Sequence, residues 1–142
     1  KVCVTVFARD SRRECRARME TVLLAMLIFQ IKHFLCDFVL QTSAQIRNKG
    51  NYLHWGGLTH AGLHVVGSVP ALWVLTHTQW VIGAMLLGEF VIHYHTDWAK
   101  ARIDRMLRLN DTNTLYWTIF GSDQLIHQMT YLAMTYGALR FG

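Results

Sequence analysis

Four apolar segments, each about twenty residues or longer, constrain the fold of this chain more than any other feature. They cover residues 21–39, 56–75, 79–99 and 115–139. A helix needs about 20 residues to cross roughly 30 Å of hydrocarbon. Helices also satisfy their own backbone hydrogen bonds, for which lipid offers no partners. We therefore predict an all-α fold, a four-helix transmembrane bundle that includes most of the chain.

The composition also favours a membrane protein. Hydrophobic residues make up 52% of the chain and charged residues only 16%, and the mean hydropathy is +0.20. An average soluble domain has about 25% charged residues. Five tryptophans occur near the ends of the apolar segments, as in the aromatic belts of membrane proteins: Trp55, Trp73, Trp80, Trp98 and Trp117. We therefore expect membrane lipids as partners.

Each apolar segment carries two ionisable side chains that are four residues apart. The pairs are His33 and Asp37, His60 and His64, His93 and Asp97, and Asp123 and His127. Residues four apart lie on the same face of a helix, one turn from each other. If successive helices alternate in direction, all four pairs lie at a similar depth, toward one side of the bundle. We predict that they form one shared polar site.

Histidine and aspartate together are ligands for zinc, manganese or iron, and helix bundles build such sites from inward-facing side chains. The predicted ligands of a divalent metal, with zinc as the first candidate, are His33, Asp37, His60, His64, His93, Asp97, Asp123 and His127. Two metals, or one metal with outer hydrogen-bonding partners, are both compatible with this number. The alternative is a set of structural hydrogen-bonded pairs. We favour a functional site because ionisable groups are expensive to bury at membrane depth.

Four side chains are candidates for catalysis beside such a metal. Asp37, Glu89 and Asp97 are candidates for the general base. Lys100 lies seven residues after His93, on the same face of the helix, and two interpretations stay open for it. It binds a phosphate or neutralises a carboxylate, or it extends its ammonium group to the membrane interface.

Two glutamines adjoin the predicted site, and one histidine should lie away from it. Gln41 follows the first pair by one helical turn and Gln124 is next to the fourth pair, so we expect both to hydrogen-bond ligands or to bind within the site. His95 is about 200° around the helix from His93. We therefore expect His95 to point elsewhere.

Two stretches of the chain are polar and basic. Residues 1–18 are rich in arginine and precede Met19, and we interpret them as an N-terminal extension of a single four-helix membrane domain, residues 19–142. Residues 98–109 follow the third apolar segment and include several basic residues. We predict that they form a short amphipathic helix at the membrane interface.

The connections between the segments indicate an orientation. Those after the first and third segments contain the basic residues Arg47, Lys49, Lys100, Arg102, Arg105 and Arg108, whereas the connection near His77 contains none. Basic loops are enriched on the cytoplasmic side, so we expect both of these connections to be cytoplasmic. The basic residues before Met19 favour the opposite orientation if they are part of the mature protein.

Several other classes lack support in the sequence. The net charge of +5 comes largely from the N-terminal stretch and the basic segment after the third helix, so we expect lipid contact and no nucleic-acid binding. The three cysteines have no metal-ligand spacing. There is no glycine-rich phosphate loop and no G-x-S-x-G motif.

The polar motifs resemble one family. They are His33-x-x-x-Asp37-Phe38-x-Leu40-Gln41, Thr59-His60-x-x-x-His64, His93-x-x-x-Asp97-x-x-Lys100 and Phe120-x-x-Asp123-Gln124-x-x-His127. Over about residues 21–139 the chain resembles small bacterial and phage integral membrane proteins known as domain of unknown function 3307. The resemblance implies a multi-pass protein of the bacterial inner membrane and implies no activity. In its polar motifs alone, the chain is also similar to bacterial membrane-bound metal-dependent hydrolases.

Two functional hypotheses follow. The first is a metal-dependent hydrolase that acts on a lipid-linked or phosphate-bearing substrate from the cytoplasmic leaflet. The second is a small non-enzymatic membrane protein, either a conductor of metal ions or protons or a phage-encoded partner of a host membrane complex. A conductor predicts polar residues through both halves of the bundle. Between Met19 and Ile31 the only polar side chains are Glu20, Thr21 and Gln30, which favours a site over a pore.

Overall fold

The structure, a computed structural model, describes residues 2–142, with side chains described from Arg12 onward. In this part of the chain it contains helices and no strands, so the predicted all-α fold is confirmed. The elements are α1 (Val2–Phe34), the π-helical turn η1 (Leu35–Val39), α2 (Ser43–Asn48), α3 (Trp55–Leu75), α4 (Gln79–Leu107) and α5 (Thr114–Phe141).

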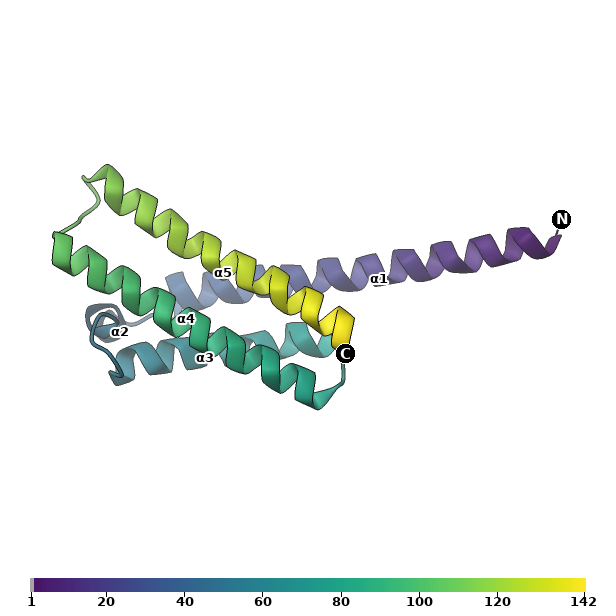
Figure 1. The fold of residues 1–142 in the computed structure, drawn as a ribbon, viewed down its shortest axis with the longest axis horizontal. Helices are drawn as coiled ribbons and strands as arrows, with labels where there is room; N and C mark the ends of the chain where they lie inside the picture. The colour runs from purple at the N-terminus through teal and green to yellow at the C-terminus, as the bar shows by residue number, and fades with distance from the viewer. Residues whose placement is uncertain (1) are drawn as a thin grey trace.

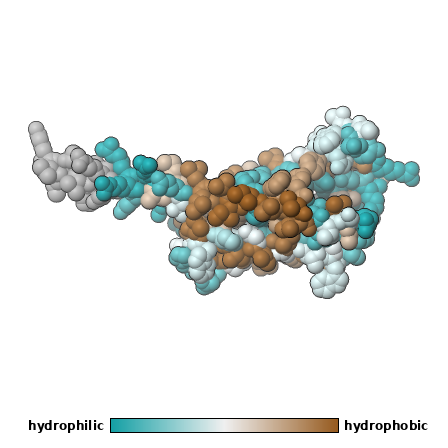
Figure 2. Space-filling view, turned by 180° about the vertical axis from the view of Figure 1, so that it is seen from behind, coloured by the Kyte–Doolittle hydropathy of each residue, from teal (hydrophilic) through white to brown (hydrophobic). Residues whose placement is uncertain are grey.

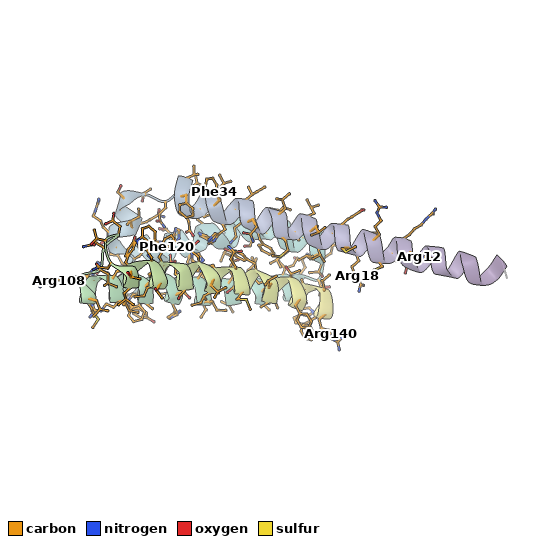
Figure 3. All side chains as sticks on the ribbon, turned by 90° about the horizontal axis from the view of Figure 1, so that it is seen from above. Arg12, Arg18, Phe34, Arg108, Phe120 and Arg140 are labelled. Carbon is orange, nitrogen blue, oxygen red and sulfur yellow. The ribbon has the colours of Figure 1, made fainter. Side chains whose placement is uncertain are left out.

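The four long helices form an antiparallel bundle (Figure 1). Helix α3 packs against both α1 and α4, and α5 packs against α4 and contacts α1 and α3. The segment around α2 and the connection between α4 and α5 lie at one end, which we call the loop end. Phe34, Arg108 and Phe120 mark this end, and Arg140 marks the other (Figure 3).

Helix α1 extends well beyond the other three helices (Figure 1). Residues 12–20 are exposed, and one ion pair, between Arg16 Nε and Glu20 Oε1 at 2.9 Å, joins two of them within the helix. The structure shows no break at the predicted boundary between residues 18 and 19, because α1 is continuous there. The side chains of residues 1–11 lie outside the described part, so the predicted extension is described only from Arg12.

The predicted separate interfacial helix at residues 98–109 is wrong. Helix α4 continues without a break from Gln79 to Leu107. Between Trp98 and Leu107 the sequence has no glycine or proline that would interrupt a helix. The helix ends at Arg108, which adopts a left-handed conformation with a φ of 52° and donates its N–H to the Asp104 carbonyl.

Helix α2 was not predicted, although its start has a clear local cause. Thr42 and Gln45 form a capping box, in which each side chain accepts a hydrogen bond from the backbone N–H of the other. This short helix carries the chain across the loop end and places Lys49 at its end, beside α4. A six-residue helix leaves little periodicity in the sequence, so its cap is the only signal.

The inside of the bundle is divided into two halves along its length. The half away from the loop end is an apolar core, built from Ala25, Phe29, Ala71, Leu72, Ile82, Tyr131, Met134 and Ala138. The half toward the loop end contains the predicted polar pairs. Because the helices are antiparallel, residues with quite different positions along each helix meet at the same level.

The outside of the bundle is strongly apolar. Leu23, Val66, Leu87, Leu125 and Leu132 are all exposed, as are many other large apolar side chains. Figure 2 shows hydrophobic residues gathered over the middle of the molecule, with hydrophilic residues at the loop end and on the projecting part of α1. Among the described residues, two helices are long and apolar enough to cross a membrane, Arg12–Val39 and Trp55–Leu75. By the same criteria α4 and α5 are not, since both contain inward-facing polar residues.

Candidate metal centre

The structure brings the four predicted pairs together at one level of the bundle. Helices α3, α4 and α5 contribute one pair each, and the first pair comes from α1 and η1. Every member is buried except Asp37, whose side chain is about one-tenth exposed. Asp37 lies in η1, where Leu40 donates its N–H to the Leu35 carbonyl at 2.8 Å, five residues back. Such single π-helical turns are rare in proteins, but where they occur they are often at functional sites.

The first group of possible ligands consists of Asp37, His60, His64 and His93. One ligand atom from each residue lies within 4.8 Å of the others. Asp37 Oδ1 connects the group, at 3.0 Å from His60 Nε2 and 3.2 Å from His64 Nε2. Three imidazoles and one carboxylate can supply the four ligands of tetrahedral zinc.

The second group consists of His93, Asp97 and His127, whose ligand atoms are equally close. His127 Nε2 lies 3.4 Å from Asp97 Oδ1, and His93 Nε2 lies 3.6 Å from Asp97 Oδ2. The two groups share His93. They are therefore neighbouring parts of one cluster, which we call the His/Asp cluster.

His93 is the member of the cluster that hydrogen bonding does not explain. Its side chain is 2% exposed, yet neither ring nitrogen has a hydrogen-bond partner among the described residues. Its ring lies between two other imidazoles, with centroids 3.8 Å from that of His64 and 4.1 Å from that of His127. A buried polar group without a partner carries a free-energy penalty of about 1–3 kcal/mol. A metal ion would remove this penalty, so the donor set fits a divalent cation.

His33 lies beside the cluster, outside both ligand groups. Its Nδ1 is 3.0 Å from the Tyr131 hydroxyl, and its Nε2 is 2.8 Å from Gln124 Oε1 and 3.3 Å from Asp37 Oδ2. Both of its nitrogens are therefore engaged with protein atoms. This geometry fits a residue that orients Asp37 better than one that ligates a metal directly.

The other predicted polar residues surround the cluster. Gln41 Nε2 lies 3.2 Å from His60 Nδ1, so Gln41 contacts a possible ligand from outside. Asp123 Oδ1 is 3.3 Å from His127 Nε2, but it has no hydrogen bond of good geometry among the described residues. Gln124 donates to the other oxygen of Asp123, at 3.2 Å. Asp123 Oδ1 is therefore a buried carboxylate oxygen that can accept a further hydrogen bond.

Two lysines near the cluster were missed by the sequence analysis. Lys49 was interpreted only as a loop charge, but its Nζ lies 2.7 Å from Asp97 Oδ2. Lys32 was not singled out at all. It is buried, its ammonium group forms an ion pair with Glu89, and it lies 3.3 Å from His64 Nδ1. A charged residue within an apolar segment was the available signal for Lys32.

Glu89 lies deep in the bundle, whereas a general base needs access to water and substrate. It is 1% exposed, and its Oε1 accepts hydrogen bonds from Lys32 and from the Ser68 hydroxyl, the latter at 2.9 Å. It does not line the cavity that leads to the cluster. Its geometry therefore fits a partner for the Lys32 charge, which in turn contacts His64.

A cavity of about 700 Å³ leads from the loop end to the cluster. Its inner wall includes Asp37, Asp97 and Asp123, and Gln41 and Gln124 also line it. Lys100 lines the same cavity, where its Nζ lies 3.5 Å from Asp104 Oδ2 and 5.2 Å from the ring centre of Phe120.

His95 lies apart from the cluster, as the helical phase predicts. It is exposed, its Nδ1 lies 2.7 Å from the Val91 carbonyl, and its ring packs near that of Tyr52. The contrast with buried His93, two residues earlier, confirms which face of α4 points inward.

The comparison with known families identifies the chain. The model of a family described as a protein of unknown function (DUF3307) matches residues 22–141. The chain belongs to the DUF3307 family. No curated protein and no solved structure matches it. In this DUF3307 protein the family match includes every residue of the His/Asp cluster and begins after the exposed residues 12–20 of α1.

Proposed function

We propose that this DUF3307 protein is a multi-pass membrane protein that holds a divalent metal in the His/Asp cluster and hydrolyses a lipid-linked or phosphate-bearing substrate. The observation that carries the metal proposal is His93, which is buried among imidazoles and has no hydrogen bond to either ring nitrogen in the described part of the chain. A purely structural network would be expected to satisfy a member as buried as His93. Zinc is the first candidate, and manganese or iron suits the same ligand types.

The ligand arrangement supports either one or two metal ions. Asp37, His60 and His64 could hold one ion, and Asp97 and His127 a second, with His93 next to both. If two ions bind, His93 would either ligate only one of them or ligate each ion through a different ring nitrogen. His33, Gln41 and Lys32 contact members of the cluster from outside and would orient them.

The same geometry supports hydrolysis. A bound divalent metal polarises a phosphoryl or carbonyl oxygen and makes water a stronger nucleophile. Asp123 is the best-placed general base, because it lines the cavity, contacts His127 and keeps one oxygen without a hydrogen-bond partner among the described residues. Asp37 and Asp97 line the same cavity, but both belong to the ligand groups, whereas Asp123 belongs to neither. Lys100 is placed to contact an anionic substrate.

The outer surface supports a membrane location. Large apolar side chains are exposed on all four long helices, whereas soluble monomers rarely expose apolar patches beyond a few hundred Å². Helices α1 and α3 have the length and apolar composition of membrane spans. Helices α4 and α5 pack beside them, and the charged residues within the bundle, such as Glu89 and Asp97 on α4, face inward. We propose that all four helices cross the bacterial inner membrane, with the loop end in the cytoplasm.

This orientation gives a direct test. The loop end contains Arg47, Arg102, Arg105 and Arg108, and cytoplasmic loops are enriched in such residues. A reporter fused after Gly142, at the opposite end, should therefore be active when it requires the periplasm and inactive when it requires the cytoplasm. Fusions in the α4–α5 connection, at Asn110, should give the reverse pattern. Cytoplasmic activity of the Gly142 fusion would contradict the proposed orientation.

The non-enzymatic alternative receives less support. A conductor needs a polar path through the whole bundle. Beyond the cluster, the described part of the bundle closes around Phe29, Leu72, Tyr131 and Met134, all of which are at most 3% exposed. A site reached from one end fits this arrangement better than a channel.

Two measurements on the purified protein test the proposed function. Elemental analysis in detergent should find zinc, manganese or iron in a stoichiometric amount, and a chelator should lower the unfolding temperature. The metal-loaded protein should release phosphate from phosphatidic acid or from a polyprenyl diphosphate in mixed micelles. Stoichiometric metal without phosphate release from either lipid would favour the non-enzymatic alternative. Protein that binds no metal would exclude the metal proposal.

Asp123→Asn separates metal binding from catalysis. Asparagine keeps the size of the side chain but cannot accept a proton from water. We expect the variant to retain its metal and to lose about 10²–10⁴-fold in hydrolytic rate. Asp111→Asn is the matched control, since Asp111 is exposed in the α4–α5 connection. Equal rates for the two variants would show that Asp123 is not the base.

A further inference from the structure

Two cavities meet at the edge of the His/Asp cluster. The first is the 700 Å³ cavity at the loop end, which we call the head cavity. The second, of about 420 Å³, is a groove between α4 and α5, which we call the chain groove. Lys100 and Asp123 line both. Each volume lies in the range of about 300–1,000 Å³ that is typical of small-molecule sites.

The head cavity has exposed arginines at its mouth, whereas the carboxylates Asp37, Asp97, Asp104 and Asp123 line the rest of it. Five cationic side chains line it: Arg47, Lys49, Lys100, Arg105 and Arg108. Lys49 and Lys100 face Asp97 and Asp104, but no carboxylate lies within ion-pair distance of the three arginines in the described part of the chain. Arginine binds phosphate groups with two parallel hydrogen bonds, so this mouth suits a phosphate.

One of these arginines already has a structural role. Arg105 donates to Asn51 Oδ1 at 2.8 Å and to the Arg47 carbonyl at 3.2 Å, which ties α4 to α2 and to the segment that follows it. Arg47 and Arg108 are exposed, and Arg108 lies at the same end of the bundle as Phe120 (Figure 3). They are therefore the arginines available for a ligand.

The chain groove is apolar and faces outward. Its walls include Ala99 and Ile103 on α4 and Ile119 and Ile126 on α5. Ile126 is 44% exposed and Ile103 39% exposed, so the groove opens on the outer surface of the bundle. On a membrane protein, that surface faces lipid chains. A hydrocarbon chain is therefore the occupant that the groove suits.

We propose that the ligand of this site is an anionic phospholipid, with its phosphate in the head cavity and one chain in the chain groove. The proposal rests on the proposed function for its chemistry, because the phosphate would then lie beside the cluster. The lipid enters sideways between α4 and α5 from the cytoplasmic leaflet. Lys100, at the junction of the two cavities, contacts the phosphate where the chain begins. A free phosphate would use the head cavity alone.

Photo-cross-linking tests the position of the chain. The full-length protein in detergent is mixed with phosphatidic acid that has a photoreactive group in one acyl chain. Cross-links should concentrate at residues 95–103 of α4 and 119–126 of α5. Cross-links spread evenly over the outer faces of all four helices would overturn the proposal.

Ala99→Phe fills the groove and supplies the decisive variant. Excluding only two methylenes of the chain removes about 1.6 kcal/mol of burial, which corresponds to more than about tenfold in affinity. We therefore expect cross-linking to fall about tenfold. Ala84→Phe is the matched control, because Ala84 is an exposed alanine on the same helix, away from the groove. The unfolding temperatures of the two variants should be similar, which shows that both are folded. Equal cross-linking in the two folded variants would overturn the proposal.

Arg108→Gln and competing ligands test the head group. The substitution should weaken binding of phosphatidic acid and leave binding of a photoreactive diacylglycerol, which has no phosphate, unchanged. Excess inorganic phosphate should displace little of the phosphatidic acid, because it lacks the chain. Displacement by equimolar phosphate would mean that the site binds a free phosphate, and the lipid proposal would be wrong.

The failure of this proposal is distinguishable from failure of the proposed function. None of the groove residues belongs to either group of possible ligands, so the cross-links to α4 and α5 should persist after treatment with a chelator. Retained cross-links in a protein that binds no metal would leave the lipid proposal intact and exclude the metal. Stoichiometric metal without groove cross-links would do the reverse.

Discussion

Replacing His93 with alanine should remove most of the metal from the protein. His93 belongs to both ligand groups, so its loss affects every arrangement of one or two ions. Substitutions of residues that only orient ligands typically weaken metal binding by 10–100-fold, so loss of a direct ligand should weaken it by more than about 100-fold. Elemental analysis after dialysis measures the effect. His33→Ala should cause a smaller loss, because His33 contacts Asp37 from outside the groups.

His95→Ala is the matched control. His95 is a histidine on the same helix, two residues away, but it is exposed and contacts Tyr52 and a backbone carbonyl. Its replacement should leave the metal content unchanged. If the His93 and His95 variants lost metal equally, the inward face of α4 would be misassigned. If neither lost metal, the His/Asp cluster would be a structural network.

Lys32→Met should strongly destabilise the protein. The substitution leaves the Glu89 carboxylate buried without its cationic partner. Removing one member of a buried ion pair usually lowers the free energy of unfolding by about 3–5 kcal/mol. Thermal unfolding in detergent, measured under conditions where it is reversible, should reveal this loss.

The double variant Lys32→Met with Glu89→Gln identifies the cause. Glutamine is neutral and still accepts the hydrogen bond from Ser68, so no unpaired charge remains. The unfolding temperature of the double variant should return most of the way to that of the parent protein, since a matched neutral pair is often as stable as a buried ion pair. Arg16→Met removes a cation from an exposed ion pair and should have little effect. A double variant no more stable than Lys32→Met would indicate that packing of the lysine stem, and not its charge, matters.

The sequence was sufficient to predict four long helices and the gathering of the polar pairs. Residues four apart share a face in any helix, so His60 with His64 and His93 with Asp97 could be placed before their partners were known. The same rule placed His95 outside. These predictions depend on geometry within one helix, which the sequence contains directly.

Contacts between helices could not be predicted in this way. Lys32 meets Glu89 and His64 across the bundle, and Lys49 reaches Asp97 from the segment after α2. Such pairings depend on how the helices rotate and pack, which periodicity does not determine. The continuous α4 was missed for a related reason. A polar stretch after an apolar one indicates a change of surroundings, but the helix itself ends only at Arg108.

The apolar half of the bundle gives the proposed membrane protein electrical insulation. On α5, Tyr131, Met134 and Ala138 pack against the other helices beyond the cluster, and they span about 10 Å of helix at 1.5 Å per residue. An ion in this layer would lose its hydration without gaining ligands. In the proposed membrane protein, charged groups, a bound metal and water would therefore lie deep inside without opening a path for protons across the membrane. The membrane potential would fall across the apolar layer, and the chemistry would stay at the potential of the cytoplasm.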